Sequence, residues 1–280
     1  MRIPKLLFST CSKSQTKIGI LNTQRSLLLR NNPDWRYQCF GDEDCKNFMK
    51  EAYAGDVYKA FQKINPHYGA AKADLFRYCL MYKYGGIYLD YKSSSRTPLT
   101  KLLKKDDSYI LSQWDNGQGE AHEGWGLHNK VKSIEGGEYQ QWIIICTPKH
   151  PFLRDVIDNV VANIQQYPNR TQYHSGRMGV LEITGPIAYT EAIQNHIITN
   201  SLISGKDYRM IKAKEKGLIY SVFEDTHYLN VDANISGTSC ADTHRNNAYM
   251  RSHYSRRRDP IVINPCTDAD NRKDPGTKEV

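Results

Sequence analysis

Residues 70–95, AAKADLFRYCLMYKYGGIYLDYKSSS, contain the features from which the rest of the chain is interpreted. Apolar residues at helical spacing fill the first part, which stops at Gly85-Gly86, a pair suited to the end of a helix. The apolar residues 87–89 predict a short strand, and Asp90 follows it directly. Ligands bind at the carboxyl ends of strands in open α/β sheets, so Asp90 is predicted to face a ligand.

Asp74 and Arg77 lie three residues apart on the predicted helix, so both should project from one face. An exposed ion pair is the structural interpretation of this spacing. The functional interpretation is that Asp74 accepts hydrogen bonds from sugar hydroxyls while Arg77 contacts the sugar or its phosphate. Asp90 is open to the same choice: it either caps a loop or binds a divalent cation that neutralises a diphosphate.

The composition favours an enzyme or a binding protein with an anionic ligand. The 280 residues suffice for one large α/β domain or two small ones, and the formal charge of +8 favours partners such as nucleotide phosphates. We expect no nucleic-acid binding, because no stripe of Lys and Arg is interleaved with aromatic residues. Tyrosine is frequent (19, against 7 phenylalanines), which suits stacking on sugars or bases as well as covering the core edge.

Seven cysteines without a C-x-x-C pair argue against a zinc module and for a reducing compartment. Cys79 and Cys146 sit in apolar runs and are predicted to be buried. The apolar runs are shorter than the roughly 18 residues of a membrane span, and no secretory leader is recognised. We therefore expect a cytoplasmic protein.

The order of the predicted elements is that of an α/β fold with a mostly parallel sheet and crossover helices. Strands are predicted at 3–9, 35–40, 87–89, 109–113, 142–146, 208–211 and 218–223, and helices at 15–30, after 41, and at 56–64, 68–84, 98–103, 152–167 and 186–196. The aperiodic stretches 114–138 and 168–180 are predicted to be loops that bind the acceptor. We expect one domain over residues 1–263 and a disordered tail over 264–280.

His253 is a lone imidazole near the end of the chain. An ordinary surface histidine is the structural interpretation, and a metal ligand brought from the far end of the chain is the functional one. The sequence has no P-loop and no G-x-G-x-x-G, G-x-S-x-G or H-E-x-x-H motif, which excludes kinase, classical dinucleotide-binding, esterase and zincin functions.

Residues 72–90, KADLFRYCLMYKYGGIYLD, closely resemble the signature of the DxD-containing sugar-binding-region glycosyltransferases. This family includes the Och1-like mannosyltransferases and capsular-polysaccharide transferases, with the clostridial glucosylating toxins as distant relatives. Weaker matches follow the family's order, namely IPKLLFST at 3–10, NPDWRYQCFGDED at 32–44, KHPFLRDVID at 149–158, TGP at 184–186 and HYS at 253–255. The resemblance implies a GT-A fold: a single mixed, mostly parallel sheet flanked by helices, with a Rossmann-like nucleotide-binding half and an acceptor-side half.

The resemblance also implies a retaining transfer of a sugar from a UDP- or GDP-linked donor to a glycan, lipid-linked or protein acceptor. Asp74 and Arg77 match the sugar-contacting acid and arginine of the family, and Asp90 matches the first aspartate of the DxD. His253 matches the late histidine that helps to hold the metal or the diphosphate, and Thr10 would lie near the nucleotide base.

The sequence departs from the family pattern at Lys92, which stands where the second aspartate of the DxD is expected. An ammonium beside the diphosphate supplies part of the charge that a metal would supply, but it also weakens cation binding by repulsion. A divalent cation, Mn²⁺, held by Asp90 and His253 is still the expected cofactor, and its necessity is left open. Ser93 is expected to add a hydroxyl contact, and Arg77, Asp90 and Lys92 are the predicted catalytic residues.

Two other function classes stay open beside a glycosyltransferase. The first is a non-catalytic, GT-A-like protein that binds a nucleotide-sugar, since Lys92 replaces a metal ligand. The second is a basic nucleic-acid-binding module, which rests on net charge alone. Peripheral contact with a membrane is compatible with each of these functions, and the sequence implies no oligomeric state.

Overall fold

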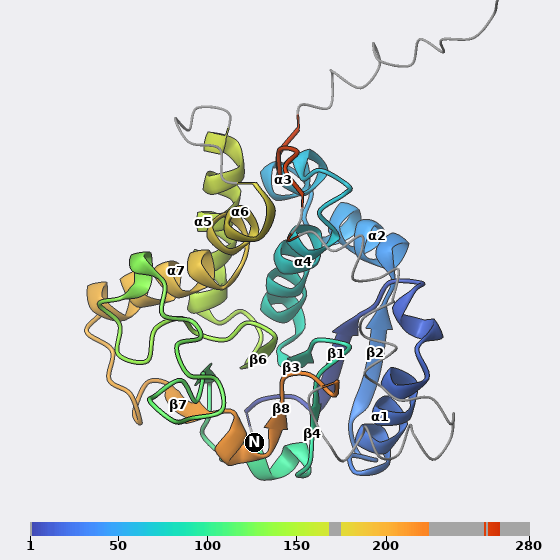
Figure 1. The fold of residues 1–280 in the computed structure, drawn as a ribbon, viewed down its shortest axis with the longest axis vertical. Coiled ribbons are helices and arrows are strands. Elements are labelled where there is room, and N and C mark those ends of the chain that lie inside the picture. The colour runs from blue at the N-terminus through green and yellow to red at the C-terminus, as the bar shows by residue number, and fades with distance from the viewer. Residues whose placement is uncertain (1, 168–174, 224–254, 256, 264–280) are drawn as a thin grey trace, which may run out of the picture.

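The computed structural model of the protein describes residues 2–167, 175–223, 255 and 257–263, which form an α/β fold (Figure 1). The main sheet consists of β1 (Leu6–Thr10), β2 (Arg36–Phe40), β3 (Gly86–Leu89), β5 (Tyr109–Gln113), β6 (Ile143–Cys146) and β7 (Arg209–Lys212). A small second sheet pairs β4 (Ser94–Ser95) with β8 (Leu218–Ile219). The helices are α1 (Gly19–Arg30), α2 (Asp42–Ala52), α3 (Asp56–Lys63), α4 (Gly69–Tyr84), α5 (Pro151–Gln166), α6 (Gly176–Ile183) and α7 (Pro186–Thr199).

The six strands of the main sheet lie in the order β2-β1-β3-β6-β5-β7. β1 is parallel to both β2 and β3, and β5 is parallel to β7, whereas β6 is antiparallel to both of its neighbours. The expectation of a mixed, mostly parallel sheet flanked by helices is therefore confirmed. The carboxyl ends of β1, β2 and β3 come together at one edge, where β3 is followed by Asp90.

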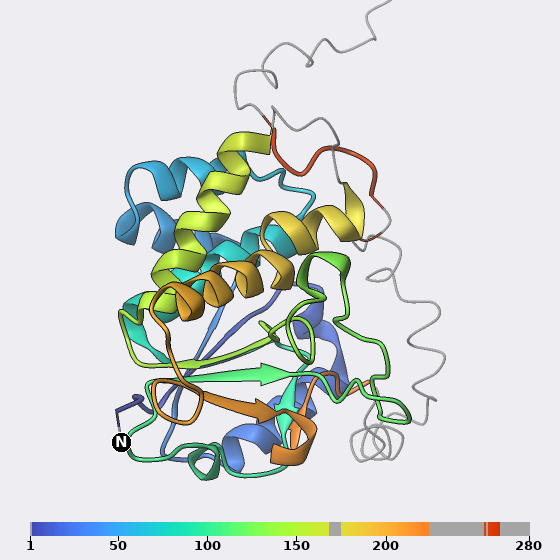
Figure 2. The ribbon, with the colours of Figure 1, turned by 90° about the vertical axis from the view of Figure 1, so that its left-hand side faces the viewer.

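Helices cover one face of the sheet, with α4, α5 and α7 packed together in a layer (Figure 2). Tyr88 and Ile144 point into this layer, whereas their chain neighbours Ile87 and Ile145 belong to the core on the other face. The alternation follows from the pleat, because successive strand residues face opposite sides of a sheet. Both faces of β3 and β6 are thus buried, which explains why these strands read as continuous apolar runs.

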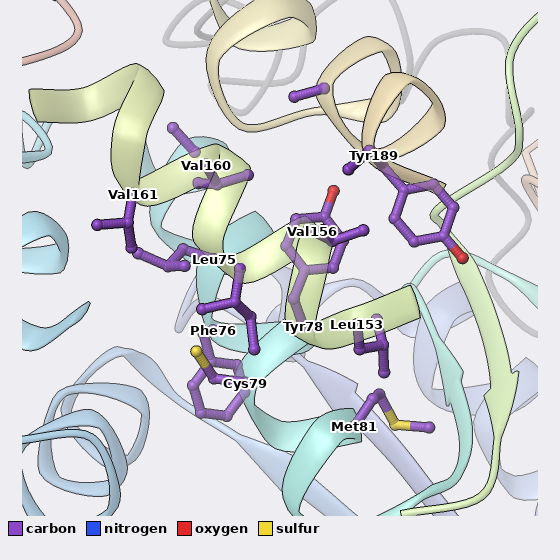
Figure 3. Packing of buried hydrophobic residues seen from close by; sticks show 14 of the residues in the cluster. Leu75, Phe76, Tyr78, Cys79, Met81, Leu153, Val156, Val160, Val161 and Tyr189 are labelled. Atoms are coloured by element: carbon purple, nitrogen blue, oxygen red, sulfur yellow. The ribbon is translucent and has the colours of Figure 1, made fainter. Parts of the chain in front are cut away.

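α4 is buried on nearly every side, so the expectation of a single apolar face was too narrow. All residues from 74 to 81 are buried, and Leu75, Tyr78 and Cys79 lie beside Leu153 and Val156 of α5 (Figure 3). A helix enclosed in this way carries every side chain of its central turns into the interior. The polar side chains of α4 must therefore find partners inside the protein.

The turn from α4 to β3 requires two consecutive glycines. Gly85 and Gly86 have φ angles of 62° and 101°, a region that favours glycine. A Cβ on Gly86 would meet the carbonyl oxygen of Leu6 at 2.4 Å, and one on Gly85 would meet the nitrogen of Pro148 at 2.5 Å. The chain reverses tightly enough to pair β3 with β1 only because both side chains are absent.

Several element boundaries differ from the predicted ones. The first strand begins at Leu6 rather than residue 3, and the first helix begins at Gly19, after a 3₁₀ turn. The predicted helix at 98–103 is a 3₁₀ turn over Leu99–Leu102, and the predicted strand at 218–223 is only β8. The domain limits of 1–263 stay a prediction, and the tail predicted over 264–280 lies outside the described residues.

α6 was missed, because it begins within the predicted loop 168–180, whose residues 168–174 lie outside the described residues. Gly176 and Gly179 lower the helix propensity of this segment. Val180 and Ile183 are buried in the helical layer and hold α6 there by packing. Across the ranges that the structure describes, no helix is both long and apolar enough to span a bilayer.

We predict that Gly86→Ala destabilises the protein by about 3 kcal/mol or more, because it adds a clash with β1 to an unfavourable φ. Gly55→Ala is the matched control, since Gly55 has a similar φ of 92° with open space where its Cβ would lie. This control should lose only about 1–2 kcal/mol. Urea denaturation of the two variants gives the comparison, and equal losses would show that the approach of Leu6 places no constraint on the turn.

Candidate functional site

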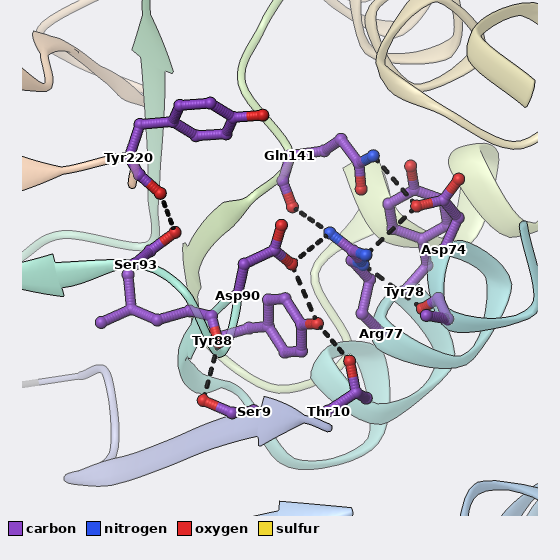
Figure 4. Close-up of polar contacts among 12 residues, drawn as sticks. Ser9, Thr10, Asp74, Arg77, Tyr78, Tyr88, Asp90, Ser93, Gln141 and Tyr220 are labelled. Atoms are coloured by element: carbon purple, nitrogen blue, oxygen red, sulfur yellow. Dashed lines mark hydrogen bonds and ion pairs between the residues drawn. The ribbon is translucent and has the colours of Figure 1, made fainter. Parts of the chain in front are cut away.

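The guanidinium of Arg77 is the centre of a polar network between α4 and the carboxyl ends of β1 and β3 (Figure 4). Its Nη1 lies 2.9 Å from Oδ1 of Asp90, and its Nη2 lies 3.2 Å from Oδ1 of Asp74. Nη1 also donates to the carbonyl of Gln141 at 3.1 Å, and Nε donates to the carbonyl of Ala73 at 3.3 Å. Each nitrogen of the guanidinium therefore has an acceptor, although only 6% of the side chain is exposed.

Asp74 is held by protein groups on both carboxylate oxygens. Gln141 Nε2 donates to Oδ1 at 3.0 Å, and Thr184 Oγ1, at the end of α6, donates to Oδ2 at 2.9 Å. Burial raises the pKa of this carboxyl above its usual value, while Arg77 acts in the opposite direction. Burial would lower the pKa of Arg77, but Asp90 and Asp74 outweigh it and raise that pKa further. The pair is thus an internal ion pair, and the interpretation as an exposed pair is wrong.

Asp90 is the member of the network that reaches the surface, with 24% of its side chain exposed. Its Oδ1 accepts a hydrogen bond from the hydroxyl of Tyr88 at 3.2 Å, and that hydroxyl lies 2.8 Å from Oγ1 of Thr10. The Tyr88 ring lies under the guanidinium of Arg77, 4.8 Å from its central carbon. The ends of β1 and β3 are joined through these contacts.

The turn after Asp90 is attached to a different part of the chain. The ammonium of Lys92 lies 3.9 Å from the ring centroid of Tyr220, which is a cation–π contact. Ser93 Oγ donates to the carbonyl of Tyr220 at 2.6 Å, and the Val222 amide donates to the carbonyl of Lys92 at 2.9 Å. Tyr220 and Val222, which come much later in the chain, therefore hold the turn of Lys92 at the same edge as Asp90.

Aromatic side chains continue from Tyr220 to form a wall beside Lys92. The Tyr220 ring packs edge-on against Trp114 at 5.0 Å and Trp142 at 5.7 Å, and Trp125 lies 5.1 Å from Trp114. Trp125 is 42% exposed, which is unusual for so large an apolar side chain. Flat exposed rings of this kind suit the apolar faces of sugars.

The structure brings four of the predicted site residues into one network, namely Thr10, Asp74, Arg77 and Asp90. Lys92 and Ser93 adjoin it through the turn, and both contact Tyr220. His253 lies outside the described residues. The roles assigned to these residues stay predictions.

The described residues include no cluster of three or more His, Cys, Asp or Glu side chains that could hold a metal. Of the two predicted metal ligands, Asp90 and His253, only Asp90 lies among the described residues. Both of its side-chain contacts to described residues use Oδ1, which leaves Oδ2 for a cation. This single oxygen fits a cation that takes its remaining ligands from a diphosphate, water and a residue such as His253.

Four residues of the site were not predicted from the sequence: Tyr88, Gln141, Thr184 and Tyr220. Tyr88 had a usable signal, since it precedes Asp90 by two residues in a strand and therefore shares its face. Thr184 lay within the TGP match but was assigned no role of its own. Gln141 and Tyr220 come from segments far along the chain, and nothing in their local sequence indicates the contacts that they make.

Comparison with known proteins gives a family match for the part of the chain that carries most of this network. Residues 20–109, which include α4 and Asp90, match the family described as "Glycosyltransferase sugar-binding region containing DXD motif". The resemblance inferred from the sequence is thereby confirmed.

Two similar sequences come from Schizosaccharomyces pombe. Inositol phosphoceramide mannosyltransferase 1 is 29% identical over 136 residues, covering 47% of this chain and 34% of that protein. Initiation-specific alpha-1,6-mannosyltransferase is 24% identical over 207 residues, covering 70% of this chain and 49% of that protein. The chain thus spans half or less of the length of these relatives.

Among solved structures, the PaToxG glycosyltransferase superposes with a TM-score of 0.52 at 14% identity, covering 89% of this chain and 86% of that one. At this level of identity the likeness concerns the fold alone. The expected GT-A fold is confirmed.

We predict that Arg77→Met lowers the free energy of unfolding by about 3–5 kcal/mol, because it leaves the buried Asp74 and the adjacent Asp90 without their counter-charge. Adding Asp74→Asn should recover part of the loss, since it removes one uncompensated carboxylate. Arg154→Met, which breaks the exposed pair with Asp158, should cost less than about 1 kcal/mol. Equal losses for Arg77→Met and Arg154→Met in urea denaturation would contradict the internal role of Arg77.

Proposed function

We propose that the protein is a retaining glycosyltransferase that moves a sugar from a nucleotide-sugar to a carbohydrate-bearing acceptor. The observation that carries the proposal is the Asp74–Arg77–Asp90 network, which lies at the carboxyl edge of the sheet and inside the matched region 20–109. A buried arginine between two carboxylates is costly to build. Its position at the ligand-binding edge of a GT-A fold supports a role for the network in donor binding.

The nucleotide half of the donor is proposed to lie across the carboxyl ends of β1 and β3. Thr10 ends β1 and reaches Asp90 through Tyr88, so a nucleoside placed at Thr10 would bring its diphosphate toward Asp90. The network fixes the rotamer of Asp90, since two groups hold its Oδ1. Pre-organisation of this kind lets a site act on developing charge without rearranging.

Departure of the nucleoside diphosphate is the step that needs positive charge. Lys92 is the cation nearest in sequence to Asp90. The Val222 amide holds its backbone carbonyl, and its ammonium lies over the ring of Tyr220. Its ammonium would stabilise the leaving diphosphate. A divalent cation, Mn²⁺ in our proposal, would neutralise the same charge when bound, held by Asp90 and His253.

Retention of configuration is proposed to follow a front-face route, in which the acceptor hydroxyl attacks from the side of the leaving group. Asp74 is a poor candidate for a covalent nucleophile, because both of its oxygens accept protein hydrogen bonds and the residue is 2% exposed. Asp90 faces the diphosphate in this arrangement. No other side chain in the described network offers a carboxylate to the sugar.

The acceptor is proposed to bind on the side of α6 and the loop 114–138. A hollow of about 300 Å³ there is lined by both apolar and charged side chains, among them Leu127, Lys130, Met178 and Glu182. Glu182 belongs to α6, and Thr184 at the end of that helix donates to Asp74, so α6 contributes to both the hollow and the network. The named relatives act on inositol phosphoceramide or initiate alpha-1,6-mannosylation, and a glycan or lipid-linked glycan acceptor is consistent with this mixed lining. Peripheral contact with a membrane would accompany a lipid-linked acceptor.

The alternative is a nucleotide-sugar-binding protein without transferase activity, which the replacement of the second DxD aspartate by Lys92 favours.

A cytoplasmic location is also proposed, and the five described cysteines support it because all are free thiols.

We predict that one sugar linked to UDP or GDP raises the melting temperature of the protein, and that Asp90→Asn lowers transfer of that sugar about a hundredfold or more while the fold is kept. A thermal-shift panel of nucleotide-sugars identifies the donor, and release of nucleoside diphosphate measures the transfer. Asp106→Asn, at an exposed carboxylate, is the control and should be fully active. Undiminished transfer by Asp90→Asn would sink the assignment, and donor binding without turnover by the wild type would favour the alternative.

The role of Lys92 is tested by its own substitutions. The wild type should bind nucleoside diphosphate without Mn²⁺, and Lys92→Met should bind it about tenfold more weakly, because a charge beside the diphosphate is lost. Lys92→Asp should bind it well only when Mn²⁺ is present, since it restores the metal-binding pattern. An equal requirement for Mn²⁺ in all three proteins would show that Lys92 does not replace metal charge.

A further inference from the structure

Two thiols lie side by side at the carboxyl ends of the first two strands. Cys11 directly follows β1 and Cys39 lies in β2, and their sulfur atoms are 2.9 Å apart. Both residues are partly exposed, whereas the other described cysteines are buried. A small reagent in solution can therefore reach this pair of thiols.

A buried cation lies on the same face of β2. Arg25 of α1 is 5% exposed, and its guanidinium is enclosed between the rings of Tyr37 and Tyr91, 5.1 Å from each centroid. Tyr37 and Cys39 are two residues apart in the strand, so they share the face that α1 covers. Nη2 donates to the carbonyl of Tyr91 at 3.1 Å.

The charge of Arg25 lacks a carboxylate partner among the described residues, and its Nε and Nη1 atoms are buried without a hydrogen bond there. A buried guanidinium normally pairs with an anion, because the loss of hydration is otherwise uncompensated. The groups that can supply an anion near Arg25 are the phenols of Tyr37 and Tyr91 and the thiols of Cys11 and Cys39. Burial raises the pKa of the Tyr91 phenol, so that group stays protonated.

These groups differ in how readily they ionise. Burial raises the pKa of Tyr37, and the hydrogen bond with Cys39 raises that of Cys11, so both stay protonated. For Cys39, the hydrogen bond with Cys11 is the largest effect and lowers the pKa to about 7, with Tyr37 and Arg25 acting in the same direction. Burial and Asp44 of α2 oppose this shift. Cys45 of α2 stays protonated, because burial raises its pKa.

We propose that Cys39 and Cys11 form a reactive thiol pair that hydrogen peroxide converts into a reversible disulfide between β1 and β2. The Cys39 thiolate is the anion beside Arg25, and Cys11 is the second thiol. Disulfide sulfurs are about 2.05 Å apart, so the two atoms need to approach by only about 0.9 Å from their present separation.

The chemistry balances in two steps. The Cys39 thiolate attacks one peroxide oxygen and the O–O bond breaks, which leaves Cys39 as a sulfenic acid. The departing hydroxide takes up the proton that the Cys39 thiol released on ionisation and becomes the first water. The Cys11 sulfur then attacks the Cys39 sulfur, the S–O bond breaks, and the thiol proton leaves with the hydroxyl as water. Two thiols are oxidised and one peroxide is reduced to two waters. A small thiol such as glutathione reverses the reaction by exchange.

The bridge would act on the donor site through Thr10, the residue before Cys11. Thr10 contacts the hydroxyl of Tyr88, which in turn donates to Asp90, so a shift of Cys11 changes how Asp90 is held. This consequence rests on the proposed function. The thiol pair itself does not, because its contacts and its chemistry involve no donor.

The first experiment treats the full chain with hydrogen peroxide in a Cys240→Ser, Cys266→Ser background and maps the disulfide by peptide mass. The expected product is a Cys11–Cys39 bridge that dithiothreitol removes. Cys11→Ser should stop at sulfenic and higher acids on Cys39, while Cys39→Ser should leave Cys11 unoxidised. Absence of the bridge in the folded protein, or oxidation of Cys11 in Cys39→Ser, would overturn the proposal.

The second experiment follows alkylation of Cys39 by iodoacetamide as a function of pH. Arg25→Gln should slow the reaction at pH 7 about tenfold, because the thiolate loses its counter-charge. Arg25→Lys should restore most of the rate, and Arg30→Gln, at an exposed position of the same helix, should leave it unchanged. An unchanged rate in Arg25→Gln, with folding verified by melting temperature, would refute the thiolate assignment.

Discussion

Compensation of the charges that α4 carries into the interior is the constraint on which the rest of the site depends. α4 is enclosed by α5, α7 and the sheet, so Asp74 and Arg77 cannot turn toward water. Their partners come from the end of β3, from Gln141 before β6 and from Thr184 after α6. The network around Arg77 and Asp74 thereby fixes the relative positions of segments spread over more than a hundred residues of sequence.

This arrangement has an energetic logic. An ion pair inside a protein seldom stabilises more than an apolar pair of equal size, so stability alone does not account for its presence. The pair of Asp74 and Arg77 instead positions Asp90. Arg77 and Tyr88 hold the Asp90 carboxylate while part of it stays exposed. The two glycines between α4 and β3 also help to position Asp90. They let β3 begin directly after α4, so that the carboxyl end of β3 comes back beside Arg77 of that helix.

The sequence patterns predicted the sheet strands, most helices and the place of Asp90, since these follow from local periodicity and from glycine at the end of a helix. They also grouped Asp74, Arg77 and Asp90, whose separation along the chain is short. They did not predict the burial of α4, because burial on all sides depends on which helices pack around it. α6 was missed since two glycines hide its helical pattern, and Gln141 and Tyr220 were missed since only the folded chain brings them to the site.

The pairing of β4 with β8 sets the order in which the protein can be completed during synthesis. The turn that holds Lys92 and Ser93 is fastened by residues 218–222, which leave the ribosome long after residues 92–95. Ile64 pairs with Val262, which emerges later still. The nascent chain can therefore form the first strands and helices early, but its ligand-binding edge stays unfinished until residues 218–222 have been synthesised. Long-range closure of this kind slows folding and makes a truncated chain prone to association through its open edge.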